Sequence, residues 1–188
     1  MSGGDVTKTP AFKAWFDGSK VVDHIDGTPL VVYHGARETF SVFDPDAQKE
    51  RATWAGFGSW FTADYRYAEA FASSGARKVV SVYLSIKKPM RLRGDGAQGF
   101  AKLTALYQKV TGLKTFEAGV ASNRRFRAYL KKQGYDGIHL TNFTGDAGLV
   151  PGAQTFFVAL DPTQVKSVHN GGTFDPKNPD MFMGLHTR

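Results

Sequence analysis

A chain of 188 residues, 41% of them hydrophobic and 22% charged, is long enough for one globular domain with a sizeable core, and its composition excludes a disordered or fibrous protein. Its formal net charge of +7 favours an anionic partner such as a nucleotide, a nucleic acid or an acidic protein, and a basic surface without a partner is an equally good interpretation. The absence of cysteine excludes disulfides, thiol catalysis and cysteine metal sites. The start, MSGGDVTKTP, lacks the apolar segment of a signal peptide, and no stretch is apolar enough to cross a membrane. We therefore expect a protein made and used inside a cell.

The N-terminal part predicts a short helix followed by a hairpin. Residues 9–18 (TPAFKAWFDG) favour a helix with Thr9 as its N-cap and Gly18 as its end. Residues 19–34 favour a hairpin with an Asp-Gly turn at 26–27. The second strand of this hairpin leads into the sequence VVYHG, residues 31–35.

A strand and a helix are predicted next, followed by a core strand. Aromatic residues at 59–62 indicate a strand, after which Thr62 caps a helix that ends at Gly75. The sequence KVVSVYLSI is a strand that Pro89 closes.

Two helices and three strands are predicted for the remaining chain. Apolar residues at helical spacing indicate helices over 95–112 and 122–133, the second with Ser122 as its cap. The further strands are YDGIHLTN, TFFVALDP and TQVKSV. We expect a flexible N-terminus at 1–8, a single α+β domain over 9–168 and an irregular C-terminal tail at 169–188.

Several common kinds of active site are excluded by motif. The chain has no GxxxxGK[ST] loop, no strand-linked GxGxxG that opens a helix, and no HExxH. Its five histidines show no metal-ligand spacing, so we expect no metal. A Ser/His/Asp triad stays open, although no GxSxG elbow is present, and no pair of glutamates suggests a glycosidase.

His34 and Gly35 stand where a buried strand should finish. One interpretation is a polar residue at a strand end followed by a turn. The other is that the strand presents His34 to a ligand, which Gly35 allows to approach the backbone closely. Other motifs in the chain are needed to choose between these two interpretations.

The ordered set VVYHG, GFGSWFTADYRYAEAFA and TFFVALDPTQVKS resembles the three motifs of ADP-ribosyltransferases of the His-Tyr-Glu class, the class of diphtheria toxin and the poly(ADP-ribose) polymerases. The chain is most similar to the phage and mobile-element branch, the ADP-ribosyltransferase domains of polyvalent proteins, and the resemblance covers roughly residues 9–180. It implies a split β-sandwich of two mostly antiparallel sheets with flanking helices.

The resemblance assigns the first two motifs residue by residue. His34 would bond a ribose hydroxyl of NAD, and backbone groups at Gly35 would read the nicotinamide carboxamide. The aromatic after the glycines is Trp60. The motif tyrosine is replaced by Phe71, and the small or hydroxyl position before it is Ala68. Phe71 can stack on nicotinamide but cannot donate a hydrogen bond.

Two further residues are candidates for the hydroxyl that Ala68 lacks, namely Ser59 and Tyr67. In the third motif the glutamate position falls on Phe156, and Gln154 lies two residues earlier on the same strand face. We take Gln154 as the candidate catalytic residue there. Asp146, in the preceding loop, is another possible source of negative charge.

The resemblance implies an NAD-dependent mono-ADP-ribosyltransferase that modifies a protein or nucleic acid. The alternatives are an NAD glycohydrolase, and an inactive domain that binds NAD, a partner or a nucleic acid. The basic helix 122–133 is a candidate docking face for the acceptor, and a solvated face is the simpler interpretation. His139 is expected to be structural. We expect a cytoplasmic monomer without a membrane partner, a toxin or effector that acts in its own cell or after delivery into a host cell.

Overall fold

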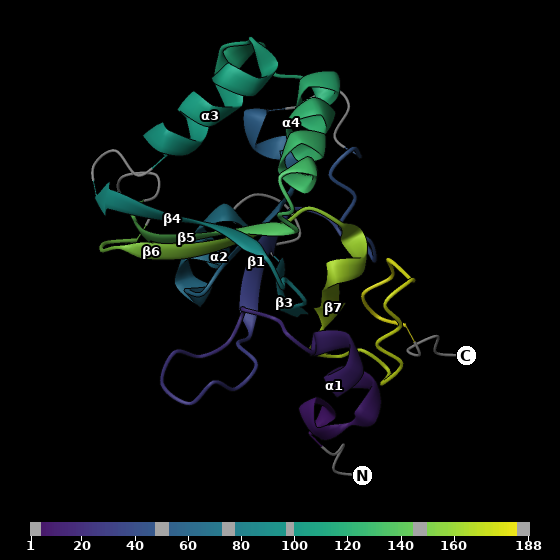
Figure 1. Ribbon diagram of the computed structural model, residues 1–188. Helices are drawn as coiled ribbons and strands as arrows, with labels where there is room; N and C mark the ends of the chain where they lie inside the picture. The colour runs from purple at the N-terminus through teal and green to yellow at the C-terminus, as the bar shows by residue number, and fades with distance from the viewer. Residues whose placement is uncertain (1–4, 48–52, 73–77, 97–99, 145–149, 184–188) are drawn as a thin grey trace.

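The computed structural model describes residues 5–47, 53–72, 78–96, 100–144 and 150–183 (Figure 1). Its seven strands form one hydrogen-bonded sheet in the order β4-β5-β6-β2-β1-β3-β7. The strands are β1 (Val32–Ala36), β2 (Ser59–Thr62), β3 (Lys78–Leu84), β4 (Pro89–Gly96), β5 (Gly137–Phe143), β6 (Gln154–Ala159) and β7 (Val165–Ser167). All neighbours are antiparallel except β4 and β5, so the α+β class is confirmed.

The expectation of two separate sheets is not confirmed, because β1 and β2 join the two groups of strands. The join is narrow: β1 pairs with β3 from Val32 to Ala36, whereas its register with β2 is the single pair Tyr33 and Thr62. Figure 1 shows β4, β5 and β6 running across the view while β1, β3 and β7 run down it, so the sheet is strongly twisted. The sheet is thus nearly split at the β1–β2 seam.

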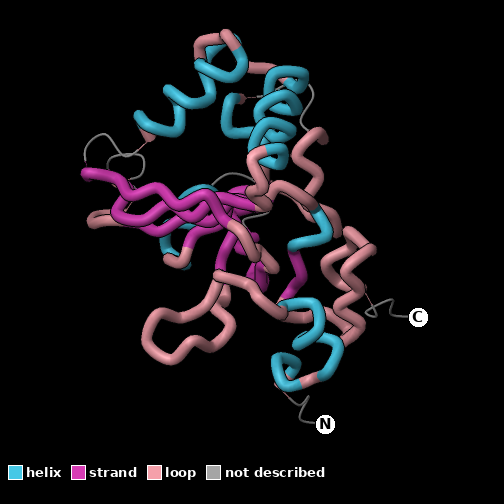
Figure 2. Tube along the Cα trace, viewed as in Figure 1, coloured by secondary structure: helices cyan, strands magenta, loops and turns pink. Residues whose placement is uncertain are grey.

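Four helices flank the sheet: α1 (Pro10–Phe16), α2 (Tyr65–Phe71), α3 (Ala101–Thr111) and α4 (Val120–Lys132). Thr9 caps α1 as predicted, since its hydroxyl accepts a hydrogen bond from the Phe12 N–H at 3.2 Å. Figure 2 shows α3 and α4 together on one side of the strands. Their inner faces pack on β4–β6 through a core that includes Leu103, Tyr107 and Phe126.

Two predicted helix caps are wrong by a few residues. Thr62 belongs to β2, and α2 is capped by Asp64, whose carboxylate accepts from the Arg66 N–H at 2.9 Å. Ser122 lies in the first turn of α4, after the N-cap Gly119, whose N–H donates to the Ser122 hydroxyl at 2.9 Å. In both cases the chain offers two capping residues close together, and sequence alone does not rank them. The Gly75 stop lies outside the described residues.

Strand β4 was not predicted. The sequence suggests Pro89 as the end of β3, but Pro89 opens the next strand, which pairs with β5 in parallel. β4 is an edge strand, where proline and glycine are tolerated because one row of backbone groups faces solvent. The expected hairpin over 19–34 is reduced to one isolated bridge between Val22 and Pro29.

The C-terminal segment is irregular over its described part, 169–183, yet it is packed against the domain. Phe174 contacts the α1 aromatic cluster, with its ring centroid 5.0 Å from that of Phe12. Lys166 of β7 is completely buried, and its ammonium donates to the carbonyl oxygens of Asn178 and Asp180 at 2.5 and 3.1 Å. These contacts tie the segment to the sheet.

Candidate functional site

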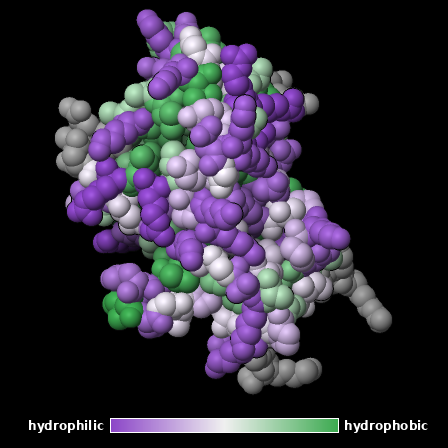
Figure 3. Space-filling view, in the orientation of Figure 1, coloured by the Kyte–Doolittle hydropathy of each residue, from purple (hydrophilic) through white to green (hydrophobic). Residues whose placement is uncertain are grey.

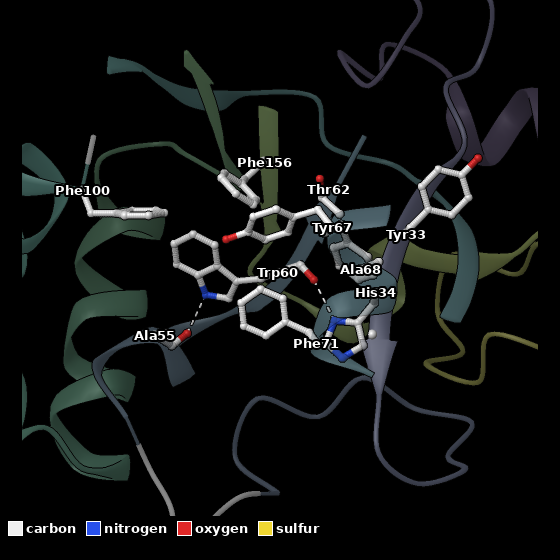
Figure 4. Close-up of a pocket in the computed structure, with 12 residues that line it drawn as sticks. Tyr33, His34, Ala55, Trp60, Thr62, Tyr67, Ala68, Phe71, Phe100 and Phe156 are labelled. Atoms are coloured by element: carbon white, nitrogen blue, oxygen red, sulfur yellow. Dashed lines mark hydrogen bonds between the residues drawn. The ribbon is translucent and has the colours of Figure 1, made fainter. Parts of the chain in front are cut away.

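A cavity of about 250 Å³ lies beside the β1–β2 seam, between the strands and α2 (Figure 4). Most of its wall is aromatic. Its lining residues are Tyr33, His34, Gly35, Ala55, Trp60, Phe61, Thr62, Tyr67, Ala68, Phe71, Phe100 and Phe156. The structure therefore brings together seven residues selected from the sequence: His34, Gly35, Trp60, Tyr67, Ala68, Phe71 and Phe156.

His34 is held in one tautomer by the seam. Its Nδ1 lies 2.8 Å from the carbonyl oxygen of Trp60, as the dashed line in Figure 4 marks. Because a carbonyl oxygen can only accept, Nδ1 must carry the hydrogen, and Nε2 of the neutral ring is then an acceptor. Burial lowers the pKa of His34 below its ordinary value of 6.5, which keeps the ring neutral near pH 7. The ring is thus prepared to accept a hydrogen bond from a ligand hydroxyl.

Gly35 has a packing role that the sequence did not reveal. A Cβ atom at this position would lie 2.1 Å from the Ala68 carbonyl oxygen and 2.9 Å from the Ala72 nitrogen. The missing side chain therefore lets α2 lie directly against β1. Gly35 also lines the cavity, so its backbone stays available to a ligand.

Trp60 and Phe71 form parts of the same wall. The Trp60 indole N–H donates to the Ala55 carbonyl at 2.7 Å, which fixes the orientation of the ring. Phe71 is 42% exposed, and its ring centroid lies 5.2 Å from that of Tyr67. An exposed aromatic at the rim of an apolar cavity is well placed to cover a flat ligand ring.

The glutamate position of the third motif is part of the aromatic wall. The Phe156 ring centroid lies 5.0 Å from that of Tyr67 and 6.4 Å from that of Trp60. Gln154 is only 5% exposed and is not in the cavity lining, and Ser59 is also outside it. No carboxylate occurs among the described lining residues, and Asp146 lies outside the described part of the chain.

A sequence model of the ADP-ribosyltransferase family of polyvalent proteins matches residues 24–174 of this chain. The chain belongs to this family. Searches of curated proteins and of solved structures found no match. Membership shows that the domain is of the kind that transfers ADP-ribose.

The ADP-ribosyltransferase domain has cavity residues that were not singled out from the sequence. Thr62 and Phe100 are the most informative. Thr62 is buried in the wall, where its hydroxyl accepts from the Asp64 N–H at 3.1 Å. Phe100 precedes α3, and its ring centroid lies 6.0 Å from that of Trp60. The sequence could have placed Thr62 in the cavity wall, since Thr62 follows Trp60 by two residues and so lies on the same face of the strand. Nothing local in the sequence connects Phe100 to the cavity.

In the ADP-ribosyltransferase domain, three basic residues of the predicted docking helix form ion pairs with acidic residues of the same domain. Arg124 and Arg127 both pair with Asp46 at 2.9 Å, and Lys131 pairs with Asp161 at 3.4 Å.

His139 stacks on Phe157 with ring centroids 4.5 Å apart, and burial together with the nearby Arg91 lowers its pKa to about 4. No helix among the described segments is long and apolar enough to span a membrane, and no group of three or more potential ligand side chains in those segments could hold a metal.

Proposed function

We propose that this ADP-ribosyltransferase domain takes ADP-ribose from NAD and attaches single units to a protein or nucleic acid. The observation that carries this proposal is the pairing of a neutral, tautomer-fixed His34 with an aromatic cavity. Such a cavity accepts a flat aromatic ring, and the histidine accepts a hydrogen bond from an adjoining sugar hydroxyl. NAD has these two chemical features side by side in its nicotinamide riboside half.

The nicotinamide ring would lie between Trp60 and Phe71, next to the Gly35 backbone. The ring is positively charged in NAD, and aromatic faces stabilise a cation within about 6 Å of the ring centroid. His34 Nε2 would accept from a ribose hydroxyl and hold C1′ toward the acceptor. These contacts position the sugar but supply no proton transfer.

The reaction is a substitution at C1′. The acceptor nucleophile forms a bond to C1′, the C1′–N bond to nicotinamide breaks, and its electron pair neutralises the nicotinamide ring. The acceptor loses a proton to solvent. Because Phe156 can neither accept a proton nor carry charge, the domain should not activate a hydroxyl of a bound ADP-ribose for chain growth. Modification with single units follows.

The same missing carboxylate supports a second candidate, a domain that binds NAD without turning it over. A charged group near the reacting sugar commonly contributes about a hundredfold or more in rate. The aromatic wall at Phe156 contributes shape but no charge. Nicotinamide release separates the two candidates.

The finer assignments are also part of this proposal: the His-Tyr-Glu class, the phage or mobile-element origin, a toxin or effector role, and a monomer acting in cytoplasm. The strand does not finish at His34 as expected, because β1 continues through Gly35 to Ala36. His34 within β1 and Trp60 on β2 nevertheless line one cavity, which supports the class.

The test uses NAD labelled in its adenylate part, incubated with the protein and a cell lysate, with and without nuclease. Nicotinamide release reports turnover, and label in a macromolecule reports transfer rather than hydrolysis. His34→Ala should reduce both by at least about tenfold, because a positioned hydrogen bond is lost. His24→Ala is the matched control, since His24 is exposed in a loop. Equal turnover in the two variants would contradict the proposal.

A further inference from the structure

The net positive charge of the chain is concentrated in one structural unit. Residues 100–135, which we name the α3–α4 arm, contain eight Lys or Arg and one Glu, whereas the other residues contain 16 of each sign. The arm therefore carries a formal charge of +7, equal to that of the whole chain. Charge gathered on one projecting unit indicates an anionic partner at that unit.

The arm begins at the cavity wall and runs along α3 to the turn at residues 113–117, which we call its tip (Figure 1). Phe100, at its base, is part of the cavity wall, and α3 leads away from it. Lys102 and Lys109 are both exposed and lie seven residues apart, so they share one face of α3 about 10 Å from each other. Lys114 follows in the link at the tip. A row of cations thus runs from the tip back toward the reacting centre.

Other cations of the arm are also turned to solvent. Arg125 and Lys132 are exposed, and neither forms an ion pair within the described parts of the chain. The three paired cations of α4 lie closer to the rest of the domain, where Asp46 and Asp161 neutralise part of their charge. In the upper part of Figure 3, where α3 and α4 lie, hydrophilic side chains cover much of the surface, with hydrophobic ones exposed between them.

The tip of the arm carries an exposed aromatic ring next to a cation. Phe116 is 80% exposed, and the Lys114 ammonium lies 5.8 Å from its ring centroid. Neighbouring Leu113 is 36% exposed. A bare phenyl ring beside lysines is the combination that stacks on an unpaired base while the cations contact its phosphates.

We propose that the α3–α4 arm binds single-stranded nucleic acid and that this nucleic acid is the acceptor, an inference that rests on the proposed transfer of ADP-ribose. An unpaired strand fits better than a duplex, because stacking on Phe116 requires a base outside a stack. A membrane surface fits less well, because it would engage the tip alone and leave the row of cations on α3 without a partner. An acidic protein would use the charges but not the aromatic ring.

The first test is binding, measured by fluorescence anisotropy of labelled oligo-dT over a range of salt concentrations. Lys102→Gln, Lys109→Gln and Lys114→Gln together should lower the magnitude of the slope of log affinity against log salt by about 2, at about 0.7 per neutralised cation for a single strand. The matched control is Lys13→Gln, Lys20→Gln and Lys177→Gln, which removes the same charge from exposed positions outside the arm. Equal losses in the two triple variants would overturn the inference.

The second test separates stacking from charge. Phe116→Ala should weaken oligo-dT binding about fivefold or more, as expected for one lost base–aromatic contact. Ile25→Ala is its control, because Ile25 is 84% exposed in a loop outside the arm. If Phe116→Ala has no effect and poly-glutamate binds as tightly as oligo-dT, the arm is a docking surface for acidic protein and the inference is wrong. Tighter binding to phosphatidylserine vesicles, lost in Phe116→Ala, would instead identify a membrane surface and refute it.

The third test distinguishes failure of the arm from failure of the chemistry. Labelled NAD is incubated with the protein and oligonucleotides. His34→Ala should keep oligo-dT binding and lose labelling, whereas the arm triple variant should lose labelling of the oligonucleotide and keep slow nicotinamide release. Label found only in protein would refute a nucleic-acid acceptor and leave ADP-ribose transfer intact. Normal oligo-dT binding without any nicotinamide release would refute the transfer and support the arm as a binding surface.

Discussion

Replacing Gly35 by alanine would place a Cβ atom 2.1 Å from the Ala68 carbonyl oxygen, although real Cβ atoms essentially never approach other heavy atoms within 3.0 Å. The backbone must therefore move by about 1 Å, and overpacking of this kind costs about 1 to 3 kcal/mol. The upper end applies, because the opposing atoms belong to the backbone of α2 and cannot rotate away. For a chain of this length, about 3 kcal/mol lowers Tm by about 6 to 12 °C.

The assay is thermal and urea unfolding of Gly35→Ala beside Gly119→Ala. Gly119 has φ −144°, and a Cβ atom added there would meet no heavy atom within 4 Å, so an alanine should cost only about 1 kcal/mol, the loss expected when alanine replaces an N-cap glycine. The displacement of α2 should also move Phe71 at the cavity rim and weaken NAD binding in the folded fraction. Equal unfolding free energies for the two variants would refute the direct packing of α2 on β1.

Three further variants test separate parts of the structure. Phe156→Glu should raise NAD hydrolysis at least about tenfold, because it places a carboxylate in the cavity wall beside the reacting sugar. Lys166→Met should lower the unfolding free energy by about 1 kcal/mol, because two partly buried carbonyl oxygens lose their donor, and limited proteolysis should then cut the C-terminal segment first. His139→Phe should reduce the loss of stability in acid. The unfolded chain binds the His139 proton near pH 6.5 and the folded chain only near 4, so stability falls as the pH drops between these values. That loss would reach about 3 kcal/mol at 1.36 kcal/mol per pKa unit, and we expect about half of it because the ring is partly exposed and screened by solvent.

Each of these outcomes can fail in a recognisable way. A folded Phe156→Glu variant with unchanged NAD hydrolysis would contradict the position of that side chain beside the sugar. Lys166→Met with unchanged stability and protease resistance would show that the segment is held by other contacts. A His139→Phe variant with the same acid profile as the parent would mean that other groups control acid unfolding.

The sequence predicted the elements whose signals are local. Thr9 caps α1 because its hydroxyl can reach an N–H three residues later, and Gly18 ends α1 because the backbone there has φ +74°. Strand β4 escaped prediction because its pattern of proline, arginine and glycine is acceptable only at a sheet edge, and edge position depends on pairing with a distant segment. The same dependence on pairing determines that the strands form one sheet rather than two.

The site was predictable where it follows motif spacing, and the remainder depends on three-dimensional proximity. Trp60 and Phe71 line one cavity, because a short strand and the following helix place them on adjacent walls. Whether these residues bind NAD stays a prediction. Gln154 was selected by strand alternation alone, and the structure places it outside the cavity lining, at the start of β6 next to a register shift. Phe100 reaches the wall only because the chain between two parallel strands returns over the sheet.

That parallel pair separates the surface of the ADP-ribosyltransferase domain that carries most of its charge from the strands that line the cavity. Residues 100–136 are the described part of the connection between β4 and β5. They pack on the sheet through Leu103, Tyr107 and Phe126, but the sheet registers of β1, β2 and β6 do not involve them. Replacing this connection by one of different length or charge, with the inward-facing residues of α3 and α4 kept, would therefore leave the strand pairing at His34 and Trp60 in place. Phe100 is the one described cavity-lining residue that the connection contributes. If the proposed transfer reaction holds, a chimera that exchanges the outer surface of this connection could change the acceptor without rebuilding the cavity at the β1–β2 seam.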